Sequence, residues 1–517
     1  MAKKVFPMRN PLPYSEAVKA LSLEEKVGQL FMPAAFINDT EEEVRKLEKL
    51  IAEHHIGSIC FFHSRASAAT NFEGKKEVVH NENSYGRLKT LIARYQQAAQ
   101  HPLLVAIDAE WGLAMRIENT PQYPYAITLG AMQGGSDLVF EVGKQIALDC
   151  RKAGIHWNLA PVVDINLNPE NPVIGYRSFG SDKYQVTQYA KSFMEGMASA
   201  DILNSIKHFP GHGDTAVDSH LGLPKIDKSK SVLHENELFP FNELIKEGVD
   251  SVMVGHLAVP ALSNGKEASA SVSEAIITGF LRKELGWSGP VISDALNMHA
   301  VSKSYTEKGL LEYEAFKAGN DVLCFADHVT EGIGQIIEKG NPEQIEASFE
   351  RLWKLKEKAF AKNVIEGDLQ QDEKLMQKLA KESLTLLKGT SHTLEKFRTE
   401  GFGLVEIGKT DNLFSEQLLA QQKNTTNVVL ALFPRQVKPK NNFGFSDSEL
   451  QTISNVLAQK NTALYLFGNP FVLNLLDWQQ AKAVVVAYQD FKVFQENALQ
   501  HFLGNLEAKG QLPVTLK

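Results

Sequence analysis

Short apolar runs alternate with longer amphipathic segments between about residue 27 and residue 325. The runs are rich in β-branched and aromatic residues, whereas intervening segments such as 41–54 and 83–97 repeat apolar residues at helical spacing. The runs lie at 27–32, 56–62, 103–108, 156–164, 202–208, 251–256, 290–294 and 321–325. Eight consecutive strand–helix units over about 300 residues predict an α/β fold with an N-terminal (β/α)8 barrel of the TIM type. The alternative is an open, doubly wound sheet.

A second strand and helix pattern follows the first. Residues 341–362 have the charged, periodic pattern of a long helix, and residues 363–368 have the composition of a turn. Beyond this turn, strand-like runs (403–407, 427–433, 463–468, 483–488) alternate with helix-like stretches (447–459, 491–503). We therefore predict a catalytic barrel over residues 1–365 and a smaller α/β sandwich domain over residues 366–517.

Composition narrows the class of protein. The 517 residues are 43% hydrophobic and 22% charged, which is typical of an ordered globular chain. The net charge of −8 provides no overall basic field, so we expect no nucleic-acid partner. No apolar run is long enough for a membrane span. The start lacks the apolar core of a signal peptide, and the three cysteines lie in apolar runs, so we expect a cytoplasmic location, or a periplasmic or exported one if a signal peptide has been removed.

Polar residues stand at the carboxyl ends of several predicted strands. They are Asp108, Asp164, the pair Lys207 and His208, His256, and Asp294. Barrel enzymes build their active sites from this end of the strands, where residues distant in sequence converge. The pattern predicts a site at this rim.

The densest polar segment is the loop at 207–220, which follows the fifth run. Its fourteen residues include three His, two Asp and one Lys, and its proline and glycines exclude a regular helix. Within it, Asp218 can accept a hydrogen bond from the imidazole of His220 and support its protonated form. This pair is a candidate general acid/base.

A second candidate group is Asp294, which ends the run 290–294. This carboxylate could cap the following helix, or it could stand in the barrel mouth. In the mouth, opposite an acid/base such as His220, it would complete the two groups of a retaining glycosidase, a nucleophile and a proton donor.

The chain resembles the family 3 glycoside hydrolases of the β-N-acetylglucosaminidase type, known from bacterial cell-wall recycling. The motifs that carry the resemblance are K-H-F-P-G-H-G at 207–213 with D-S-H at 218–220, Y-R-S-F-G at 176–180, I-S-D-A-L at 292–296, A-G-N-D at 318–321, E-S-L-T-L-L-K at 382–388 and G-Q-L-P-V-T at 510–515. The family usually has D-Q-E-G-G where this chain has D-A-E-W-G at 108–112, so Trp111 replaces a glycine near the expected pocket mouth.

The resemblance implies residue roles. It makes Asp294 the nucleophile and His220 the acid/base, with Asp218 as its partner. It assigns sugar binding to Asp108, Arg116, Arg177, Lys207 and His208. Carboxylate, guanidinium and ammonium groups can hold the hydroxyls of a pyranose in one pose, which agrees with that assignment.

The implied activity is hydrolysis of terminal, non-reducing β-N-acetylglucosamine from a cell-wall or chitin oligosaccharide, with retention and without a cofactor. Three alternatives remain. A phosphorylase would use the same residues with phosphate as acceptor, and a non-catalytic sugar-binding barrel would keep only the pocket. A metal-dependent hydrolase would bind zinc through His208, His212, Asp214, Asp218 and His220. The loop lacks an H-x-H pair on a strand, so we expect no metal.

Overall fold

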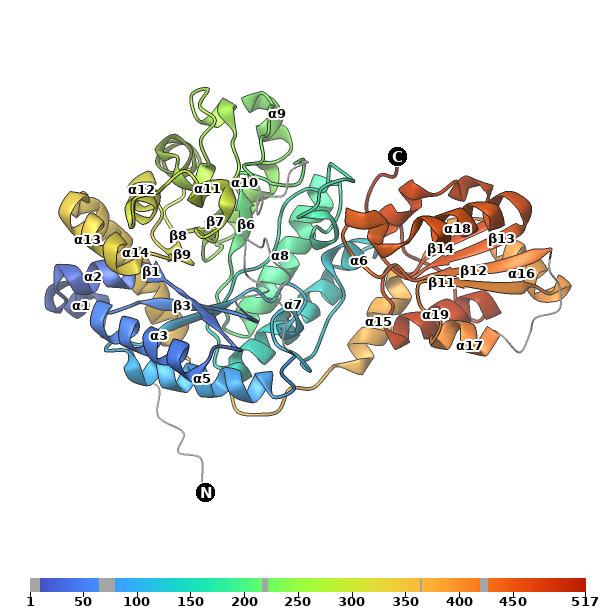
Figure 1. The fold of residues 1–517 in the computed structure, drawn as a ribbon, viewed down its shortest axis with the longest axis horizontal. Coiled ribbons are helices and arrows are strands. Elements are labelled where there is room, and N and C mark those ends of the chain that lie inside the picture. Colours follow the sequence, from blue (N-terminus) through green and yellow to red (C-terminus); the bar gives the residue numbers. More distant parts are fainter. Residues whose placement is uncertain (1–9, 65–79, 216–221, 363–364, 419–425) are drawn as a thin grey trace, which may run out of the picture. The chain divides into compact units, whose positions relative to one another are not determined.

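The structure is a computed structural model that describes residues 10–64, 80–215, 222–362, 365–418 and 426–517 (Figure 1). The chain forms two compact units. Unit 1 contains Met1–Gln122, Val142–Asp164 and Ala190–Gln371, and unit 2 contains Tyr123–Glu141, Ile165–Tyr189 and Asp372–Lys517. Two segments that precede residue 365 therefore group with the C-terminal residues. The predicted domain boundary at 365 and 366 stays a prediction.

Parallel strands form the centre of unit 1. The sheet β2-β3-β4-β5 contains Ala34–Phe36, Ser58–Phe62, Leu104–Ile107 and Trp157–Asn158. The sheet β6-β7-β8 contains Ile206–Phe209, Val252–Val254 and Val291–Ser293, and β1 (Phe31–Met32) pairs with β9 (Leu323–Cys324). All these pairings are parallel. Single parallel bridges also join Trp157 to Leu203 and Ile292 to Val322. The predicted α/β class is confirmed.

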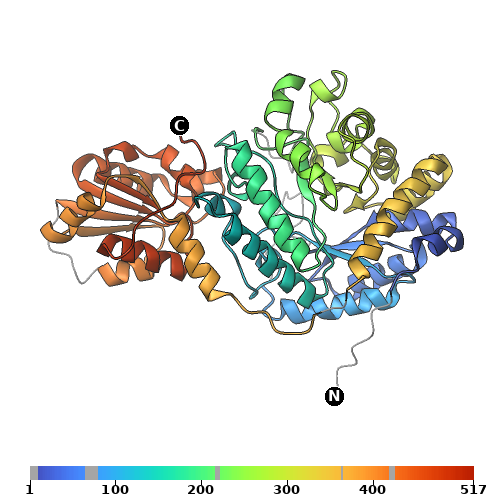
Figure 2. The same cartoon turned by 180° about the vertical axis from the view of Figure 1, so that it is seen from behind.

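Helices alternate with these strands along the chain. They are α1 (Tyr14–Ala20), α2 (Leu23–Gln29), α3 (Glu41–His54), α5 (Ser84–Ala98), α7 (Ser136–Ala153), α8 (Lys183–Ser199), α9 (Lys230–Glu235), α10 (Phe239–Lys246), a π-helix (Ala275–Glu284), α11 (His299–Ser302), α12 (Leu310–Ala318), α13 (Val329–Lys339) and α14 (Pro342–Phe360). In both cartoon views α14 lies beside α1 and α2 (Figures 1 and 2). Ala17 and Leu21 there share an apolar cluster with Phe349 and Trp353, which joins the start of unit 1 to its last long helix.

The predicted first strand is wrong for most of its length. Residues 27–29 of that run belong to α2, and only Phe31–Met32 is strand. The cause is a capping box: the Ser22 side chain accepts a hydrogen bond from the Glu25 N–H, and the Glu25 carboxylate accepts one from the Ser22 N–H. Such a box starts a helix just before an apolar run. In the fourth predicted run, the strand stops at Asn158.

Unit 2 is built on one five-stranded sheet in the order β10-β14-β13-β12-β11. Its strands are β10 (Thr385–Lys388), β11 (Gly403–Ile407), β12 (Asn427–Leu432), β13 (Asn461–Leu466) and β14 (Ala483–Val486). The last four run parallel, close to the predicted runs, and β10 is antiparallel. Helix α18 (Asp447–Gln459) lies on one side of the sheet, and α17 (Leu413–Leu418) and α19 (Lys492–Leu503) lie on the other (Figure 1).

Unit 2 also includes α6 (Ala126–Gly130), α15 (Glu373–Ser383) and α16 (Ser391–Glu400). Backbone hydrogen bonds attach the two earlier segments to the end of the chain. The N–H of Gln511 donates to the Ala131 carbonyl at 2.8 Å, and the N–H of Ser181 donates to the Pro513 carbonyl at 2.9 Å. The closing G-Q-L-P-V-T motif therefore secures both segments to unit 2.

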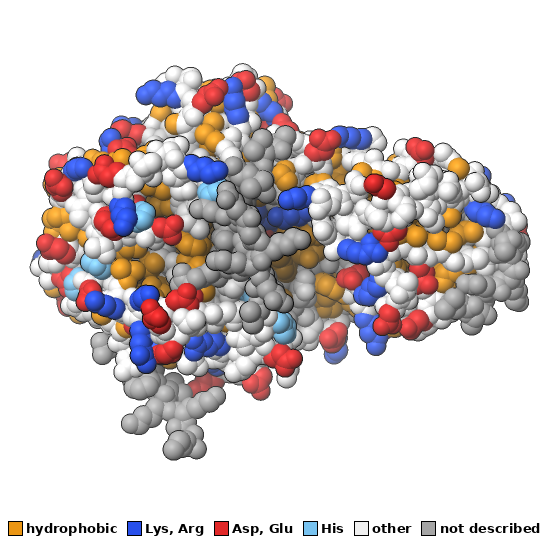
Figure 3. Space-filling view, in the orientation of Figure 1, with side chains coloured by type: hydrophobic (Ala, Val, Ile, Leu, Met, Phe, Trp, Pro, Cys, Tyr) orange, Lys and Arg blue, Asp and Glu red, His pale blue; other side chains and the backbone are white. Residues whose placement is uncertain are grey.

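One face of the molecule is mixed in charge. On the face drawn in Figure 3, Lys and Arg side chains are interspersed with Asp and Glu side chains. Over the described ranges, no helix is long and apolar enough to cross a membrane.

Candidate active site

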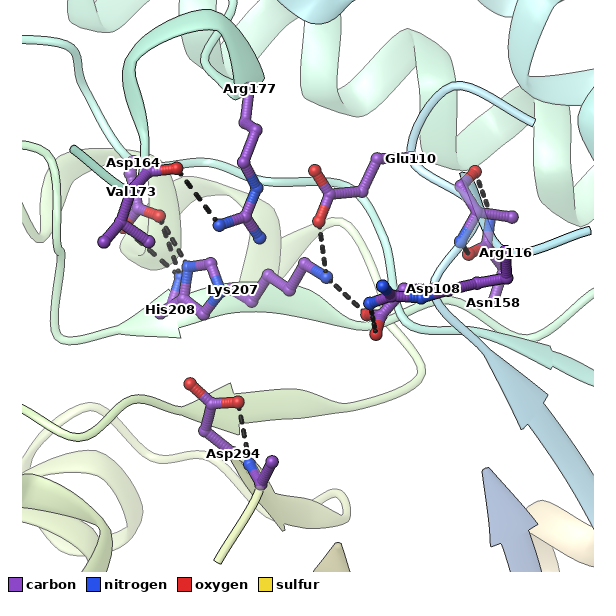
Figure 4. A network of polar contacts seen from close by, with 12 residues as sticks. Asp108, Glu110, Arg116, Asn158, Asp164, Val173, Arg177, Lys207, His208 and Asp294 are labelled. Carbon is purple, nitrogen blue, oxygen red and sulfur yellow. Dashed lines mark hydrogen bonds and ion pairs between the residues drawn. The ribbon is translucent and has the colours of Figure 1, made fainter. Parts of the chain in front are cut away.

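A buried ion-pair network lies at the carboxyl ends of the strands of unit 1 (Figure 4). Its centre is Lys207 on β6, whose side chain is only 2% exposed. The Lys207 Nζ lies 2.8 Å from Asp108 Oδ1 and 2.8 Å from Glu110 Oε1. The Arg116 Nη2 lies 2.8 Å from the other oxygen of Asp108. Two cations and two carboxylates from separate parts of the chain are thus held together.

The network keeps Asp108 ionised. Burial by itself raises the pKa of this carboxyl, but the charges of Lys207 and Arg116 outweigh burial and hold the pKa well below its usual range. Asp108 can therefore accept hydrogen bonds from sugar hydroxyls at any ordinary pH.

Local backbone contacts position this network. Asp108 directly follows β4, and the next residue is clamped by the Asn158 amide, which accepts from the Ala109 N–H at 2.9 Å and donates to the Ala109 carbonyl at 3.1 Å. Gly112 then adopts a φ of 103°, a conformation that L side chains rarely adopt. Because of this turn, Glu110 and Arg116 reach the same ion-pair network. The Arg116 guanidinium also lies 5.1 Å from the centre of the Phe62 ring.

A second pair lies next along β6. The Nδ1 of His208 lies 2.8 Å from Asp164 Oδ2, and the backbone N–H of His212 donates to Asp164 Oδ1 at 2.7 Å. Asp164 is buried, which raises its pKa, but the neighbouring His208 and the donated hydrogen bonds lower it overall. The carboxylate thus fixes both the His208 ring and the first turn of the loop that follows.

Asp294 stands directly after β8. Its Oδ1 accepts the Ala295 N–H at 2.8 Å, and its own N–H donates to the Val254 carbonyl at 2.9 Å. Figure 4 shows its carboxylate directed toward the side of the network that holds His208 and Lys207. Burial raises the pKa of Asp294, but the charges of His256, His208 and Lys207 and the Ala295 hydrogen bond lower it overall. Asp294 is therefore an ionised carboxylate at a strand end.

The predicted site residues fall into three groups. The structure brings Asp108, Arg116 and Lys207 into direct contact, and it places His208 and Asp294 within electrostatic reach of each other. Arg177 belongs to unit 2, where its Nη1 donates to the Val173 carbonyl at 3.3 Å. Asp218 and His220 lie outside the described residues. The roles assigned to these residues stay predictions.

Sequence reasoning missed Asn158, which holds the backbone after Asp108 but lies inside an apolar run that gave no signal. Asp164 was predicted from its strand-end position, and Glu110 stands in the D-A-E-W-G motif, but their ion pairs with His208 and Lys207 were not predicted. Within the described ranges, no group of three or more His, Cys, Asp or Glu side chains is placed to hold a metal ion.

The chain was compared with known proteins. The model of the glycosyl hydrolase family 3 N terminal domain matches residues 22–355. Beta-hexosaminidase A of Pseudoalteromonas piscicida is 32% identical over 342 residues, which cover 60% of this chain and 55% of that protein. The match thus spans little more than half the length of this relative.

Solved structures resemble both units. A glycoside hydrolase family 3 beta-N-acetylglucosaminidase from Paenibacillus sp. str. FPU-7 is 27% identical, with a TM-score of 0.77 over 96% of this chain and 99% of that one. The beta-glucoside phosphorylase BglX bound to 2FGlc shares the fold, with a TM-score of 0.81 over 97% of this chain and 95% of that one at 20% identity. Since the family model matches more than half of the chain, this protein belongs to glycosyl hydrolase family 3.

Proposed function

We propose that this protein is a retaining exo-β-N-acetylglucosaminidase. The observation that carries the proposal is the ionised, strand-end Asp294, whose carboxylate points toward the side of the Asp108, Lys207 and Arg116 network where His208 and Lys207 lie. The names of the relatives support the same substrate class, because both a beta-hexosaminidase and a beta-N-acetylglucosaminidase match the chain. The substrate would be a cell-wall or chitin oligosaccharide that ends in β-linked N-acetylglucosamine.

We also infer that the strands of unit 1 form a closed (β/α)8 barrel. The parallel pairings and single bridges run in the order β2, β3, β4, β5, β6, β7, β8, β9 and β1. Strands β1 and β2 are consecutive in the chain, separated by Pro33 alone, so they count as one strand and the ring has eight. A ring that returns to its starting strand has the connectivity of a barrel, and it would gather every strand end at one mouth.

In the proposed mechanism, a carboxylate oxygen of Asp294 attacks the anomeric carbon. The bond to the leaving oxygen breaks, its electron pair stays on that oxygen, and His220 supplies the proton. Water, deprotonated by the now neutral His220, then attacks the same carbon and releases Asp294. Asp108, Arg116, Lys207 and His208 would hold the ring hydroxyls.

A direct assay tests this function against the phosphorylase alternative. Nitrophenyl β-glycosides of N-acetylglucosamine and glucose should be compared with and without inorganic phosphate. We expect preference for the N-acetylglucosaminide and release of free sugar in both buffers. Formation of a sugar 1-phosphate that competes with hydrolysis would instead make the protein a phosphorylase.

The acid/base role has its own test, because His220 and Asp218 lie outside the described residues. An acidic phenol leaves without much proton donation, whereas a sugar alcohol needs it. General acid catalysis is worth roughly 10²–10⁴-fold, so His220→Ala should slow glycosylation by oligosaccharides about that much and by nitrophenyl glycosides clearly less. Asp218→Asn should show a milder form of the same pattern. Equal losses for both substrate types would exclude His220 as the acid.

A further inference from the structure

We propose that His256 is a positioning residue for Asp294 and that it acts through the backbone of Ala295. The inference rests on the proposed role of Asp294 as the nucleophile. His256 follows β7 by two residues and is fully buried. Its Nε2 lies 2.8 Å from the carbonyl oxygen of Ala295.

Ala295 connects the histidine to the nucleophile. Its N–H donates to Asp294 Oδ1 at 2.8 Å, while its carbonyl is bound by His256. The two peptide groups that flank residue 295 are therefore each held by one of these side chains. The backbone donor occupies Oδ1, which leaves the second oxygen of Asp294 to face a sugar. A fixed carboxylate plane is what in-line attack on an anomeric carbon requires.

The proton positions on His256 follow from its neighbours. A carbonyl oxygen only accepts, so Nε2 must carry a proton and donate to Ala295. The Nδ1 lies 2.7 Å from the Ser271 hydroxyl, which lies 3.0 Å from the Ser269 hydroxyl. If Ser271 donates to Nδ1, the ring is neutral; if Ser271 donates to Ser269, the ring is protonated on both nitrogens. Nε2 remains a donor in both cases.

The support behind His256 is buried and hydrogen-bonded. Ser271 is fully buried, and its carbonyl accepts from the Asn320 amide at 2.8 Å. The same amide donates to the Ala315 carbonyl at 2.6 Å, at the end of α12. The chain of contacts thus runs from α12 through Ser271 and His256 to the residue after the nucleophile. A reacting group supported in this way keeps its geometry, and a misplacement of about 1 Å can cost about 10²-fold in rate.

Two substitutions of His256 test whether its hydrogen bond to the Ala295 carbonyl matters, or only the presence of a polar side chain. The side-chain amide of Gln can reach the position of His Nε2, whereas that of Asn reaches only the position of Nδ1. We expect His256→Asn to slow covalent labelling of the enzyme by a 5-fluoro N-acetylglucosaminyl fluoride by about 10–10²-fold. His256→Gln should recover most of that rate. The dissociation constant of N-acetylglucosamine should change little in both variants, because His256 is proposed to bind the Ala295 carbonyl and not the sugar.

His156→Asn is the matched control, since it is the same change at a buried histidine before β5, where Nδ1 accepts the Val105 N–H. It should change thermal stability and leave labelling intact. Asp294→Asn provides the second control: if it still labels, the proposed nucleophile is wrong, whatever His256 does. If Asp294→Asn is dead and His256→Asn labels like wild type, or if Gln is as slow as Asn, the positioning role of His256 is overturned.

Discussion

Lys207 and Lys356 are two deeply buried lysines of unit 1, one at each end of its strands, and they have opposite surroundings. Lys207 at the carboxyl ends lies 2.8 Å from each of two carboxylates. Lys356 on α14 is fully buried, and its Nζ donates to the amide oxygen of Gln29, just before β1. Burial without a neighbouring carboxylate lowers the pKa of Lys356 to about 7. Equal burial is thus accompanied by two carboxylate partners at one end and by a lowered lysine pKa at the other.

Two buried histidines of unit 1 show the same difference between the two ends of the strands. His208 at the carboxyl ends pairs with the buried Asp164. His156, just before β5, accepts the Val105 N–H through Nδ1, and burial lowers its pKa to about 3. A buried polar residue in this fold is thus not by itself a site. The candidate site is the cluster at the carboxyl ends, where Lys207 and its two carboxylates lie within electrostatic reach of the strand-end Asp294.

The largest difference in kcat/KM is expected when Lys207 and Lys356 are replaced in turn. Lys207→Met should lower kcat/KM by about 10²–10⁴-fold, because removing one partner of a buried ion pair costs about 3–5 kcal/mol and here leaves two carboxylates without their shared cation. Lys356→Met should leave kcat/KM within about twofold of wild type, because distant sites act independently. Steady-state kinetics on a nitrophenyl N-acetylglucosaminide measures both. Equal effects of the two substitutions would refute the contrast.

A smaller loss is expected from the pair next along β6. Asp164→Asn removes the charge beside His208 and one acceptor of the backbone N–H groups, so kcat/KM should fall about 10–100-fold, since hydrogen bonds to charged groups are worth about 1.5–3 kcal/mol. Asp250→Asn is the matched control, because Asp250 is also buried and accepts the Asn204 N–H at 3.1 Å. It should lower the melting temperature and leave kcat unchanged.

Replacing Glu110 should weaken the ion-pair network around Lys207 while the contacts of Asp108 with Lys207 and Arg116 remain. Glu110→Gln keeps an oxygen near Lys207 but removes one of its two negative partners, so we expect kcat/KM to fall about 10-fold, mostly through KM. The control is Glu346→Gln, which changes a partly exposed carboxylate paired with Lys26 at 2.6 Å. Activity should not change there, since exposed pairs contribute little. An unaltered KM in Glu110→Gln would remove Glu110 from the site.

The smallest expected effect is on the free energy of unfolding, and it comes from Lys356 at the amino ends of the strands of unit 1. Between the pKa of Lys356 in the fold, about 7, and its unfolded value of about 10.4, the unfolded chain binds a proton that the native protein lacks. This group therefore makes the free energy of unfolding rise with pH, by at most about 1.4 kcal/mol per pH unit, over that window. Urea unfolding at pH 7 to 9.5 should show a shallower slope for Lys356→Met. Identical slopes would mean that Lys356 is charged in the fold.

The sequence predicted the parts of this architecture that depend on local pattern. Helix 41–54 is α3 residue for residue, and 447–459 is α18, because capping boxes at Thr40 and Ser446 set their starts. Strand β10 was missed because its only ladder partner, β14, lies about a hundred residues away in sequence. The grouping of residues 123–141 and 165–189 with unit 2 was missed for the same reason, since its evidence is contacts with the last residues of the chain.

For the site, the polar residues at predicted strand ends were the useful signal, because parallel strands bring their carboxyl ends to one edge. They are Asp108, Asp164, Lys207, His208, His256 and Asp294. This signal could not reveal that Glu110 shares Lys207 with Asp108, since that depends on the turn at Gly112. Nor could it reveal that Lys356 is buried, because in the sequence this lysine belongs to the charged, periodic pattern of the predicted helix 341–362.

The central claim is that Asp294 carries the sugar. Incubation with a 5-fluoro N-acetylglucosaminyl fluoride, followed by proteolysis and mass spectrometry, should place one covalent glycosyl group on the peptide that contains Asp294, and Asp294→Asn should not be labelled. NMR of the first product formed from a β-glycoside should show the β-anomer. A label on any other carboxylate, or the α-anomer as first product, would contradict the account.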